Sequence, residues 1–315
     1  MKFWKMNGAG NDFILINNIE EKLPAEVFPD LARTLCTRRL SIGADGMMIV
    51  EKPTMGGDLK MLFFNSDGSV GEMCGNGARC ICRYAVESGF SEGSRQVIET
   101  TAGIVTGQRL DERNFRIRLN DPSVIETSHP LTVDGETYEA YYVVLGDPGI
   151  PHACVPIRDL AGFDKDRLRE TGRKMRFHES FPKGANVNFF EIQENGEILE
   201  YTYERGVEDF TYACGTGTGS VGAALAVRAA GCGNACEGTE GSPADRKAPA
   251  AGTIRREGDL VTHSFVLHMA GGTLTVDVVL EGKTVKDLYL SGPTNIVATG
   301  EIRDEELVLK GKEEG

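Results

Sequence analysis

Two cysteines stand at the start of predicted helices and could act as a pair. Cys74 lies in the segment MCGNGARC (residues 73–80), and Cys214 lies 140 residues later in ACGTGTGS (residues 213–220). In each copy a glycine-rich turn leads into a helix, whose N-terminus carries partial positive charge and unpaired backbone N–H groups. That end lowers the pKa of a thiol and binds a carboxylate. The two segments therefore predict one substrate carboxylate held between two acid/base thiols.

These residue types suit the inversion of an amino-acid α-carbon. Backbone N–H groups at Gly75–Asn76 and Gly215–Thr216 would bind the α-carboxylate and make the α-proton easier to remove. One thiolate would take the proton from one face, and the opposing thiol would return a proton to the other face, so no cofactor is required. His152 and Glu204 are candidate groups to take the proton from a thiol.

Other interpretations of these residues are less specific. Cys36 and Cys154 are expected to be small buried hydrophobic side chains. The other four cysteines lie in the first helix and near residues 232–236, without partners at zinc-site spacing, so no metal is predicted. The glycine-rich run 215–219 could bind phosphate, but it has no Walker lysine.

The bulk composition is that of a globular protein of 315 residues, enough for one large or two ordinary domains. The net charge of −13 argues against nucleic-acid binding, which requires a basic surface. The longest apolar runs have the length of strands, and the first residues lack the apolar core of a signal peptide, so no membrane segment is expected. Eight cysteines in a chain of this length indicate reduced thiols and a cytoplasmic location.

An internal repeat relates the two halves of the chain. Asn65 and Arg205 each lie nine residues before the reactive cysteine of their copy, and Asn11 and His152 lie 63 and 62 residues before it. Further on, LNDP (residues 119–122) matches LSGP at a larger offset, which indicates an insertion in the second copy. A repeat of this kind predicts two structurally similar units.

Two similar α/β halves follow from the repeat. We expect the first half to comprise residues 1–120, with about 291–315 packing back on it, and the second to comprise residues 121–290. Residues 232–262 are the predicted insertion, mobile and on the surface. A cleft between the halves would present both cysteine helices to one ligand.

Apolar patterning predicts the secondary structure of both halves. The expected helices cover residues 26–38, residues 164–175 and the stretches that follow the two cysteines. The expected strands cover residues 3–6, 13–16, 47–50, 59–64, 97–100, 103–106, 115–119, 141–145, 186–192, 198–203, 263–269, 273–280 and 286–290. The first strand runs into a glycine-rich turn at 7–12, and the strand at 141–145 runs into residues 146–152 in the same way.

Taken in order, the motifs resemble those of the diaminopimelate epimerase family. They are KMNGAGNDF (5–13), NSDG (65–68), EMCGNG (72–77), PH (151–152), NVNF (186–189), ERG (204–206) and ACGTG (213–217). The resemblance covers nearly the whole chain except residues 232–262, and the combination is highly specific although no single motif is.

The resemblance implies a cofactor-independent, pyridoxal-free epimerase that converts LL-2,6-diaminopimelate to the meso form for lysine and peptidoglycan synthesis. It also implies two pseudo-symmetric α/β halves, each a mixed sheet or barrel around a central helix, with the active site in the cleft between them. A homodimer is common in the family. By the same resemblance Cys74 and Cys214 are the two bases, and Arg205 pairs with the distal carboxylate. The substrate-binding residues implied are Asn11, Asn65, Gly75, Asn76, Asn186, Glu204, Arg205, Gly215 and Thr216, with His152 in a supporting role.

Two positions depart from the family pattern. Ile150 stands where the family often has an asparagine that touches the distal end of the substrate, and Phe210 opens the Phe-Thr-Tyr run that replaces Glu-Thr-Leu before the second cysteine. Both changes predict a more apolar pocket, which leaves open a racemase of another amino acid such as histidine. A proline racemase would require a secondary amine, which fits Arg205 less well. A non-catalytic amino-acid-binding protein of the same fold is the remaining alternative.

Overall fold

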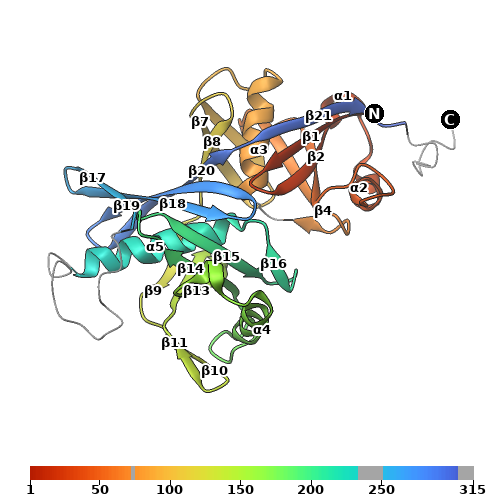
Figure 1. Ribbon diagram of the computed structural model, residues 1–315. Helices are drawn as coiled ribbons and strands as arrows, with labels where there is room; N and C mark the ends of the chain where they lie inside the picture. The colour runs from red at the N-terminus through yellow and green to blue at the C-terminus, as the bar shows by residue number, and fades with distance from the viewer. Residues whose placement is uncertain (72–74, 233–250, 304–315) are drawn as a thin grey trace. The chain divides into compact units, whose positions relative to one another are not determined.

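The computed structural model describes residues 1–71, 75–232 and 251–303 (Figure 1). The chain folds into two compact units. Unit 1 comprises Met1–Ile117 together with the chain from Gly292 onward, and unit 2 comprises Arg118–Ser291. Each unit contains both helices and strands, as the α/β interpretation predicts.

Unit 1 is built from nine strands and three α-helices among its described residues. The strands are β1 (Lys2–Gly8), β2 (Asn11–Asn17), β3 (Gly46–Glu51), β4 (Leu59–Asn65), β5 (Val70–Gly71), β6 (Arg95–Thr100), β7 (Gly103–Arg109), β8 (Asn114–Arg118, ending at the boundary) and β21 (Asn295–Glu301). The helices are α1 (Asn18–Glu21), α2 (Phe28–Cys36) and α3 (Gly75–Glu87), with a 3-10 turn, η1 (Ala25–Val27), before α2.

Unit 2 contains the remaining elements. The strands are β9 (Pro122–Glu126), β10 (Leu131–Val133), β11 (Glu136–Tyr138), β12 (Tyr141–Gly146), β13 (Gly149–Pro156), β14 (Asn186–Ile192), β15 (Ile198–Glu204), β16 (Asp209–Thr211), β17 (Thr253–Glu257), β18 (Leu260–Met269), β19 (Gly272–Glu281) and β20 (Thr284–Pro293). The helices are η2 (Leu160–Gly162), α4 (Lys165–Arg176) and α5 (Gly215–Cys232).

The two units repeat one order of elements, which confirms the repeat seen in the sequence. In unit 1 the hairpin β1–β2 is followed by α2, and β2 then pairs with β3 in parallel. In unit 2 the hairpin β12–β13 is followed by α4, and β13 pairs with β14 in parallel. Beyond these, β4 pairs in parallel with β6 across α3, as β15 pairs with β18 across α5. Each unit is therefore a mixed sheet with one long helix inserted at the same point.

Each hairpin is extended by a third strand, which pairs with the first strand of that hairpin. In unit 1, β21 pairs antiparallel with β1, from Lys2 opposite Glu301 to Asn7 opposite Asn295. In unit 2, β9 pairs antiparallel with β12. The last described strand of the chain, β21, thus lies beside the first, β1. Each strand pairs backbone N–H and C=O groups that would be unpaired at the edge of the other strand.

The long helices α3 and α5 are the inner elements of the units. Every residue of α3 from Gly75 to Ala85 is buried, and the helix packs against β1, β2, β6 and β7. Helix α5 packs against β9, β12, β13, β14, β18 and β19, and its run of Gly, Ala and Ser lets these strands approach closely. Among the described residues, no helix has both the length and the apolar character to cross a membrane.

The outer helices pack against the opposite side of the strands through one apolar face. In α2 that face is formed by Phe28, Leu31 and Leu35, which join a cluster with Ile49 of β3. The helix begins at Phe28, later than the predicted residue 26, because a 3-10 turn precedes it. Helix α4 begins after Asp164, whose carboxylate accepts from the N–H groups of residues 166 and 167 as an N-cap.

Several strands are absent from the prediction. The chain forms the strand β13 from Gly149 to Pro156, because the loop after β12 consists of Asp147 and Pro148 alone. Strand β17 and the start of β18 lie within residues 232–262, which were predicted to be a mobile insertion. Residues 253–257 are exposed on both faces, so they carry no alternating apolar pattern. The strands β9, β10, β11, β16 and β21 are also missing from the prediction, and residues 233–250 lie outside the described chain.

Gly8 marks the closest approach of a strand to the start of α3. A Cβ atom at this position would lie 2.9 Å from the carbonyl oxygen of Asn76 and 3.1 Å from Sγ of Cys80. The turn that follows contains only Ala9 and Gly10, both with positive φ, as a two-residue hairpin requires. The hairpin β1–β2 therefore holds Asn11 at the start of a strand, beside the first turn of α3.

We expect Gly8→Ala to destabilise the protein by about 1–3 kcal/mol, because the added methyl group meets helix backbone that has no free space to move into. The free energy of unfolding in urea measures the effect. Gly93→Ala is the matched control, since the nearest atom to its Cβ would be 3.8 Å away. Equal stability of the two variants would contradict the close packing of β1 on α3.

Candidate active site

The predicted substrate-binding residues of unit 1 lie at the ends of strands and in the first turn of α3. Asn11 is the first residue of β2, and Asn65 is the last residue of β4, where its Nδ2 donates to Oγ of Ser69 at 2.9 Å. Gly75 and Asn76 are the first two residues of α3 and are buried. Cys74, the first predicted base, lies outside the described residues.

A chain of hydrogen bonds joins Asn76 to Asn11 and orients both amides. Arg79 donates from Nη2 to Oδ1 of Asn76 at 2.7 Å, Asn76 donates from Nδ2 to Oδ1 of Asn11 at 2.6 Å, and Asn11 donates from Nδ2 to Oδ2 of Asp45 at 3.1 Å. A guanidinium only donates and a carboxylate only accepts, so the direction of every bond between them is set. Each amide nitrogen also carries a second N–H.

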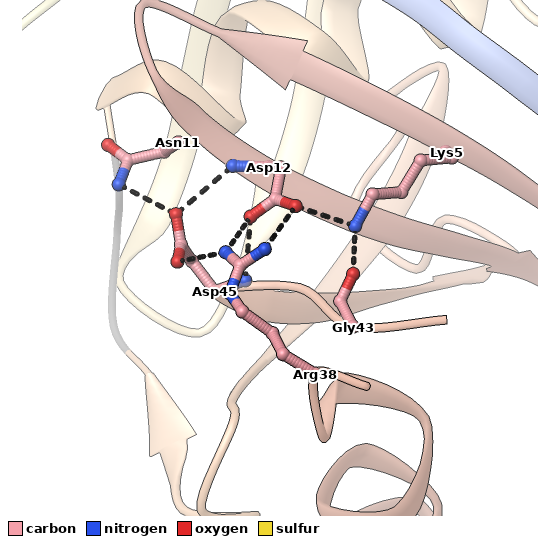
Figure 2. Close-up of polar contacts among 6 residues, drawn as sticks. All are labelled: Lys5, Asn11, Asp12, Arg38, Gly43 and Asp45. Carbon is pink, nitrogen blue, oxygen red and sulfur yellow. Dashed lines mark hydrogen bonds and ion pairs between the residues drawn. The ribbon is translucent and has the colours of Figure 1, made fainter. Parts of the chain in front are cut away.

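The carboxylate of Asp45 belongs to a cluster of four charged side chains. Figure 2 shows the Arg38 guanidinium between the carboxylates of Asp12 and Asp45, with hydrogen bonds of 2.5 and 3.1 Å to Asp12 and 2.8 Å to Asp45. Lys5 forms an ion pair with Asp12 at 2.7 Å and donates to the carbonyl oxygen of Gly43. Burial acts to raise the pKa of Asp12, but hydrogen bonds from Arg38 and Lys5 and their positive charges lower it overall. The cluster therefore holds the Asp45 side chain in place beside Asn11.

The second predicted base, Cys214, lies immediately before α5 and is 8 % exposed. Its Sγ is 3.5 Å from Oγ1 of Thr216. Burial raises the pKa of the thiol, and the charge of Glu204 raises it further, whereas contacts with Thr216 and the N–H of Gly217 lower it. The net shift is upward, opposite to the predicted effect of a helix N-terminus, because desolvation of the thiolate outweighs the helix contribution.

His152 is fully buried and is connected to the same helix start through Asn188. Asn188 Nδ2 is 3.2 Å from His152 Nδ1. The Oδ1 atom of Asn188 would lie 2.1 Å from a Cβ atom at position 217, so only glycine fits there. Burial and the charge of Arg205 lower the pKa of His152 to about 3. The imidazole is neutral and accepts at Nδ1, so the proton sits on Nε2, which has no partner among the described residues. His152 is therefore a buried donor, and the prediction that it takes a proton from a thiol is not supported.

The structure brings the predicted residues Asn186, Glu204 and Arg205 together at one end of the unit 2 sheet. Asn186 accepts at Oδ1 from the backbone N–H of Arg205 at 2.7 Å, and it pairs with His152 in the parallel register of β13 and β14. Glu204 ends β15, and Arg205 follows it with an exposed side chain whose Nη1 donates to the carbonyl of Lys183 at 3.2 Å. The backbone of Arg205 is thus held by Asn186, and one terminal nitrogen of its exposed guanidinium is held by the carbonyl of Lys183.

The two positions that depart from the family pattern differ in their surroundings. Ile150 lies in β13 opposite Leu145 and is partly exposed. Phe210 packs its ring against Phe189, Tyr201 and Tyr203 at centroid distances of 6.0–6.3 Å. Phe210 therefore packs on the apolar cluster of unit 2, and the expectation that it makes the pocket more apolar stays a prediction.

The remaining described cysteines are structural. Cys36 and Cys154 are buried, as predicted, and burial raises the pKa of both thiols, to about 11 for Cys36. Cys80 and Cys82 are fully buried within α3. Within the described parts of the chain no three His, Cys, Asp or Glu side chains are grouped in a way that could hold a metal ion.

Comparison with known proteins agrees with the repeat and the motifs. Residues 3–123 and 144–237 match the family profile described as diaminopimelate epimerase. The chain belongs to the diaminopimelate epimerase family. A diaminopimelate epimerase from Aquifex aeolicus is 42 % identical over 226 residues, which cover 69 % of this chain and 78 % of that protein. One from Alkaliphilus metalliredigens is 33 % identical over 317 residues, covering 95 % of this chain and 96 % of its own length.

Solved structures with low sequence identity share the fold of this family member. A phenazine biosynthesis protein of the PhzF family from Bacillus anthracis superposes with a TM-score of 0.65 at 15 % identity, covering 96 % of this chain and 98 % of the other. A probable proline racemase from Agrobacterium radiobacter gives a TM-score of 0.64 at 15 % identity, covering 98 % and 94 %. At such identity the likeness concerns the fold alone.

Asp45 and Arg38, which hold Asn11 in position, were not among the predicted site residues. The sequence held a weak signal, since Asp45 lies in a glycine turn before a strand, like the turn that contains Asn11. Spacing along the chain does not reveal that the two turns share one charge cluster. Their contact arises from the parallel pairing of β2 with β3, which sets Phe13 opposite Gly46.

The charge cluster predicts a pH-dependent loss of stability in Asp12→Asn. At pH 7 we expect a loss of about 1–3 kcal/mol, because Lys5 and Arg38 lose the anion between them. The folded-state pKa of Asp12 lies below 3.8, so its contribution is present above that pH and disappears as the pH falls below it. Urea unfolding at several pH values should show the two proteins converge in acid.

Asp30→Asn is the matched control for this measurement. Asp30 also pairs with an arginine, Arg33, but the carboxylate side chain is 79 % exposed. We expect a change of about half a kcal/mol or less. A gap between wild type and Asp12→Asn that stays constant down to pH 2 would contradict the role of the ionised carboxylate.

Proposed function

We propose that this protein converts LL-2,6-diaminopimelate to meso-diaminopimelate by moving a proton between Cys74 and Cys214, without a cofactor. The observation that carries the proposal is structural equivalence. Helices α3 and α5 occupy the same position in the repeated order of elements, and each begins one residue after a cysteine. Two proteins of this family that are named diaminopimelate epimerase match 95 % and 96 % of the length of the chain.

The reacting α-carboxylate would bind to the first turns of both helices. The N–H groups of Gly75 and Asn76 and those of Gly215 and Thr216 belong to the first turns, where helical partners are missing. Neutralising the carboxylate there stabilises the negative charge that develops when the α-proton leaves. The oriented amides of Asn76 and Asn11 would place their free N–H groups toward the same ligand.

Proton transfer requires one thiolate and one thiol at the start of each turnover. Burial and Glu204 favour the protonated form of Cys214, so this residue is the proton donor of the resting enzyme and Cys74 the base. The Cys74 thiolate takes the α-proton and leaves a carbanion, and Cys214 then gives its proton to the opposite face. The product leaves with inverted configuration, Cys74 is protonated and Cys214 is a thiolate, ready for the reverse direction or for exchange with solvent.

The distal end of the substrate would pair with Arg205. Diaminopimelate carries a second carboxylate. The exposed guanidinium, whose backbone is held by Asn186 and whose Nη1 donates to the carbonyl of Lys183, can bind it through its other N–H groups. Histidine, the other substrate left open by the sequence, has no such group. The role of Arg205 therefore separates the two substrates. A homodimeric state and a cytoplasmic location form part of the same proposal.

Replacing either base should abolish the exchange of the α-proton with solvent for one of the two stereoisomers, substrate or product. With LL-diaminopimelate in heavy water, Cys74→Ser or Cys214→Ser should lower epimerisation by about 100-fold or more, because serine is a far weaker acid and base at neutral pH. Deuterium incorporation into recovered substrate and into product, measured by mass spectrometry, reports the two sides separately.

The control for the cysteine variants is Cys36→Ala, which removes a buried thiol from the unit 1 core. It should keep the wild-type exchange pattern, whatever it costs in stability. Background exchange in the wild type as well as in both serine variants would identify a binding protein instead of an enzyme.

Arg205→Gln should lower kcat/KM for diaminopimelate by about 30-fold or more, which corresponds to losing a carboxylate–guanidinium contact of about 2 kcal/mol or more. Arg173→Gln removes an arginine paired with Glu170 on the surface of α4 and should leave kcat/KM unchanged. Turnover of histidine that is as insensitive to Arg205→Gln as to Arg173→Gln, with no turnover of diaminopimelate, would move the assignment to a histidine racemase.

A further inference from the structure

Glu200 is a buried carboxyl group that the proposed reaction does not use. It lies on the inward face of β15, between Ile198 and Thr202, and only 1 % of its surface is exposed. An apolar side chain would be expected there, because burying a carboxylate without an ionic partner is costly. Glu200 therefore calls for an explanation beyond packing.

The contacts of Glu200 lead directly to the backbone of Cys214. Its Oε2 is 2.8 Å from Oγ1 of Thr218, and the same hydroxyl is 2.9 Å from the carbonyl oxygen of Cys214. Its other oxygen, Oε1, has no hydrogen-bond partner in the described parts of the chain. Thr218 is fully buried.

Counting protons shows that this arrangement has two states. The Thr218 hydroxyl has a single proton and faces two oxygen acceptors, with the weakly accepting Sδ of Met269 further away at 4.0 Å, so it serves only one oxygen at a time. When Glu200 is neutral, its O–H donates to Thr218, and Thr218 donates to the Cys214 carbonyl. When Glu200 is ionised, Thr218 must donate to the carboxylate, and the Cys214 carbonyl keeps only the N–H of Thr218 at 2.9 Å.

The surroundings favour the neutral state over a wide pH range. Burial raises the pKa of Glu200 to about 8, although the hydroxyl groups of Thr218 and Thr202 act to lower it. The titratable groups that face it are the thiols of Cys154, from β13, and Cys214, and its negative charge raises the pKa of both. The imidazole of His152 is connected through Asn188 and Thr202 and stays neutral.

We propose that Glu200 is a positioning residue for the Cys214 thiol: its neutral carboxyl group holds the Cys214 carbonyl through Thr218, and its ionisation withdraws that hydrogen bond and places a negative charge near the sulfur. This deepens the proposed function, on which it rests, because it predicts that Cys214 loses reactivity at alkaline pH through a residue outside the substrate site. Neither Glu200 nor Thr218 contacts the reacting atoms in this assignment.

The test compares Glu200→Gln with wild type by two independent readouts. The first is the rate at which iodoacetamide alkylates Cys214, followed by mass spectrometry of the tryptic peptide 206–228, in which Cys214 is the single cysteine. At pH 6 the rates should agree, because Glu200 is neutral in both proteins. At pH 9 the variant should react about threefold to tenfold faster, since no carboxylate opposes the thiolate.

The second readout is the pH profile of diaminopimelate epimerisation. Wild-type kcat should fall as the pH rises through about 8, the pKa of Glu200, whereas Glu200→Gln should keep its activity through that range. Thr218→Val removes the donor to the carboxylate, so Glu200 should ionise at a higher pH and the alkaline fall should move upward. Glu197→Gln is the control, because this nearby glutamate is partly exposed and pairs with His268 instead.

The stability of Glu200→Gln supplies a check with a definite sign. Because the folded state raises the pKa of Glu200 from 4.5 to about 8, wild-type stability falls as the pH rises through this window. The urea midpoint of Glu200→Gln should therefore rise relative to the urea midpoint of wild type as the pH increases from 5 to 8. A purely space-filling role predicts a constant difference.

The proposal would be overturned if folded Glu200→Gln matched wild type in two measurements: the alkylation rate of Cys214 at pH 9 and the fall of kcat as the pH rises through 8. The two proposals fail separately. If wild type does not epimerise diaminopimelate but the alkylation rates diverge above pH 8, the proposed substrate is wrong and the link from Glu200 to Cys214 stands.

Discussion

A helix that begins inside a protein leaves its first N–H groups without helical partners, and both α3 and α5 begin in this way. The interior must supply acceptors for these groups or leave them free for a ligand. Glycines at both starts let strands and side chains come close, as Gly8 and Gly217 show with their contacts to Asn76 and Asn188. The rest of each unit is arranged around that buried helix end.

The two units place different side chains around the starts of α3 and α5. In unit 1 a chain of hydrogen bonds begins at the buried cation Arg79 and ends at the carboxylate of Asp45, so charge sets the direction of every amide. In unit 2 the groups around Cys214 are neutral or acidic: a neutral His152, a carboxyl group at Glu200 and a second acid at Glu204. A repeated fold thus surrounds its two helix starts with different charged and polar side chains.

The repeat and most long elements were predictable, because they depend on local patterns. Helix α3 lies in the stretch that follows Cys74, as expected, and α2, α4 and the strands on either side of them fall near their predicted ranges. The failures share one cause. Strand β17 is exposed on both faces and β13 contains glycine and proline, so neither shows an apolar alternation, and only pairing with β18 and β12 makes them strands.

The amino-acid sequence by itself determined the family, the pair of cysteines and the order of elements, since these follow from residue types at fixed spacing. Tertiary structure alone decided the protonation of the site. The pKa of Cys214 rises where the helix end predicted a fall, and His152 becomes a donor where a base was expected, because both side chains lose contact with water. Desolvation depends on what packs around a group from distant parts of the chain, and no local motif records it.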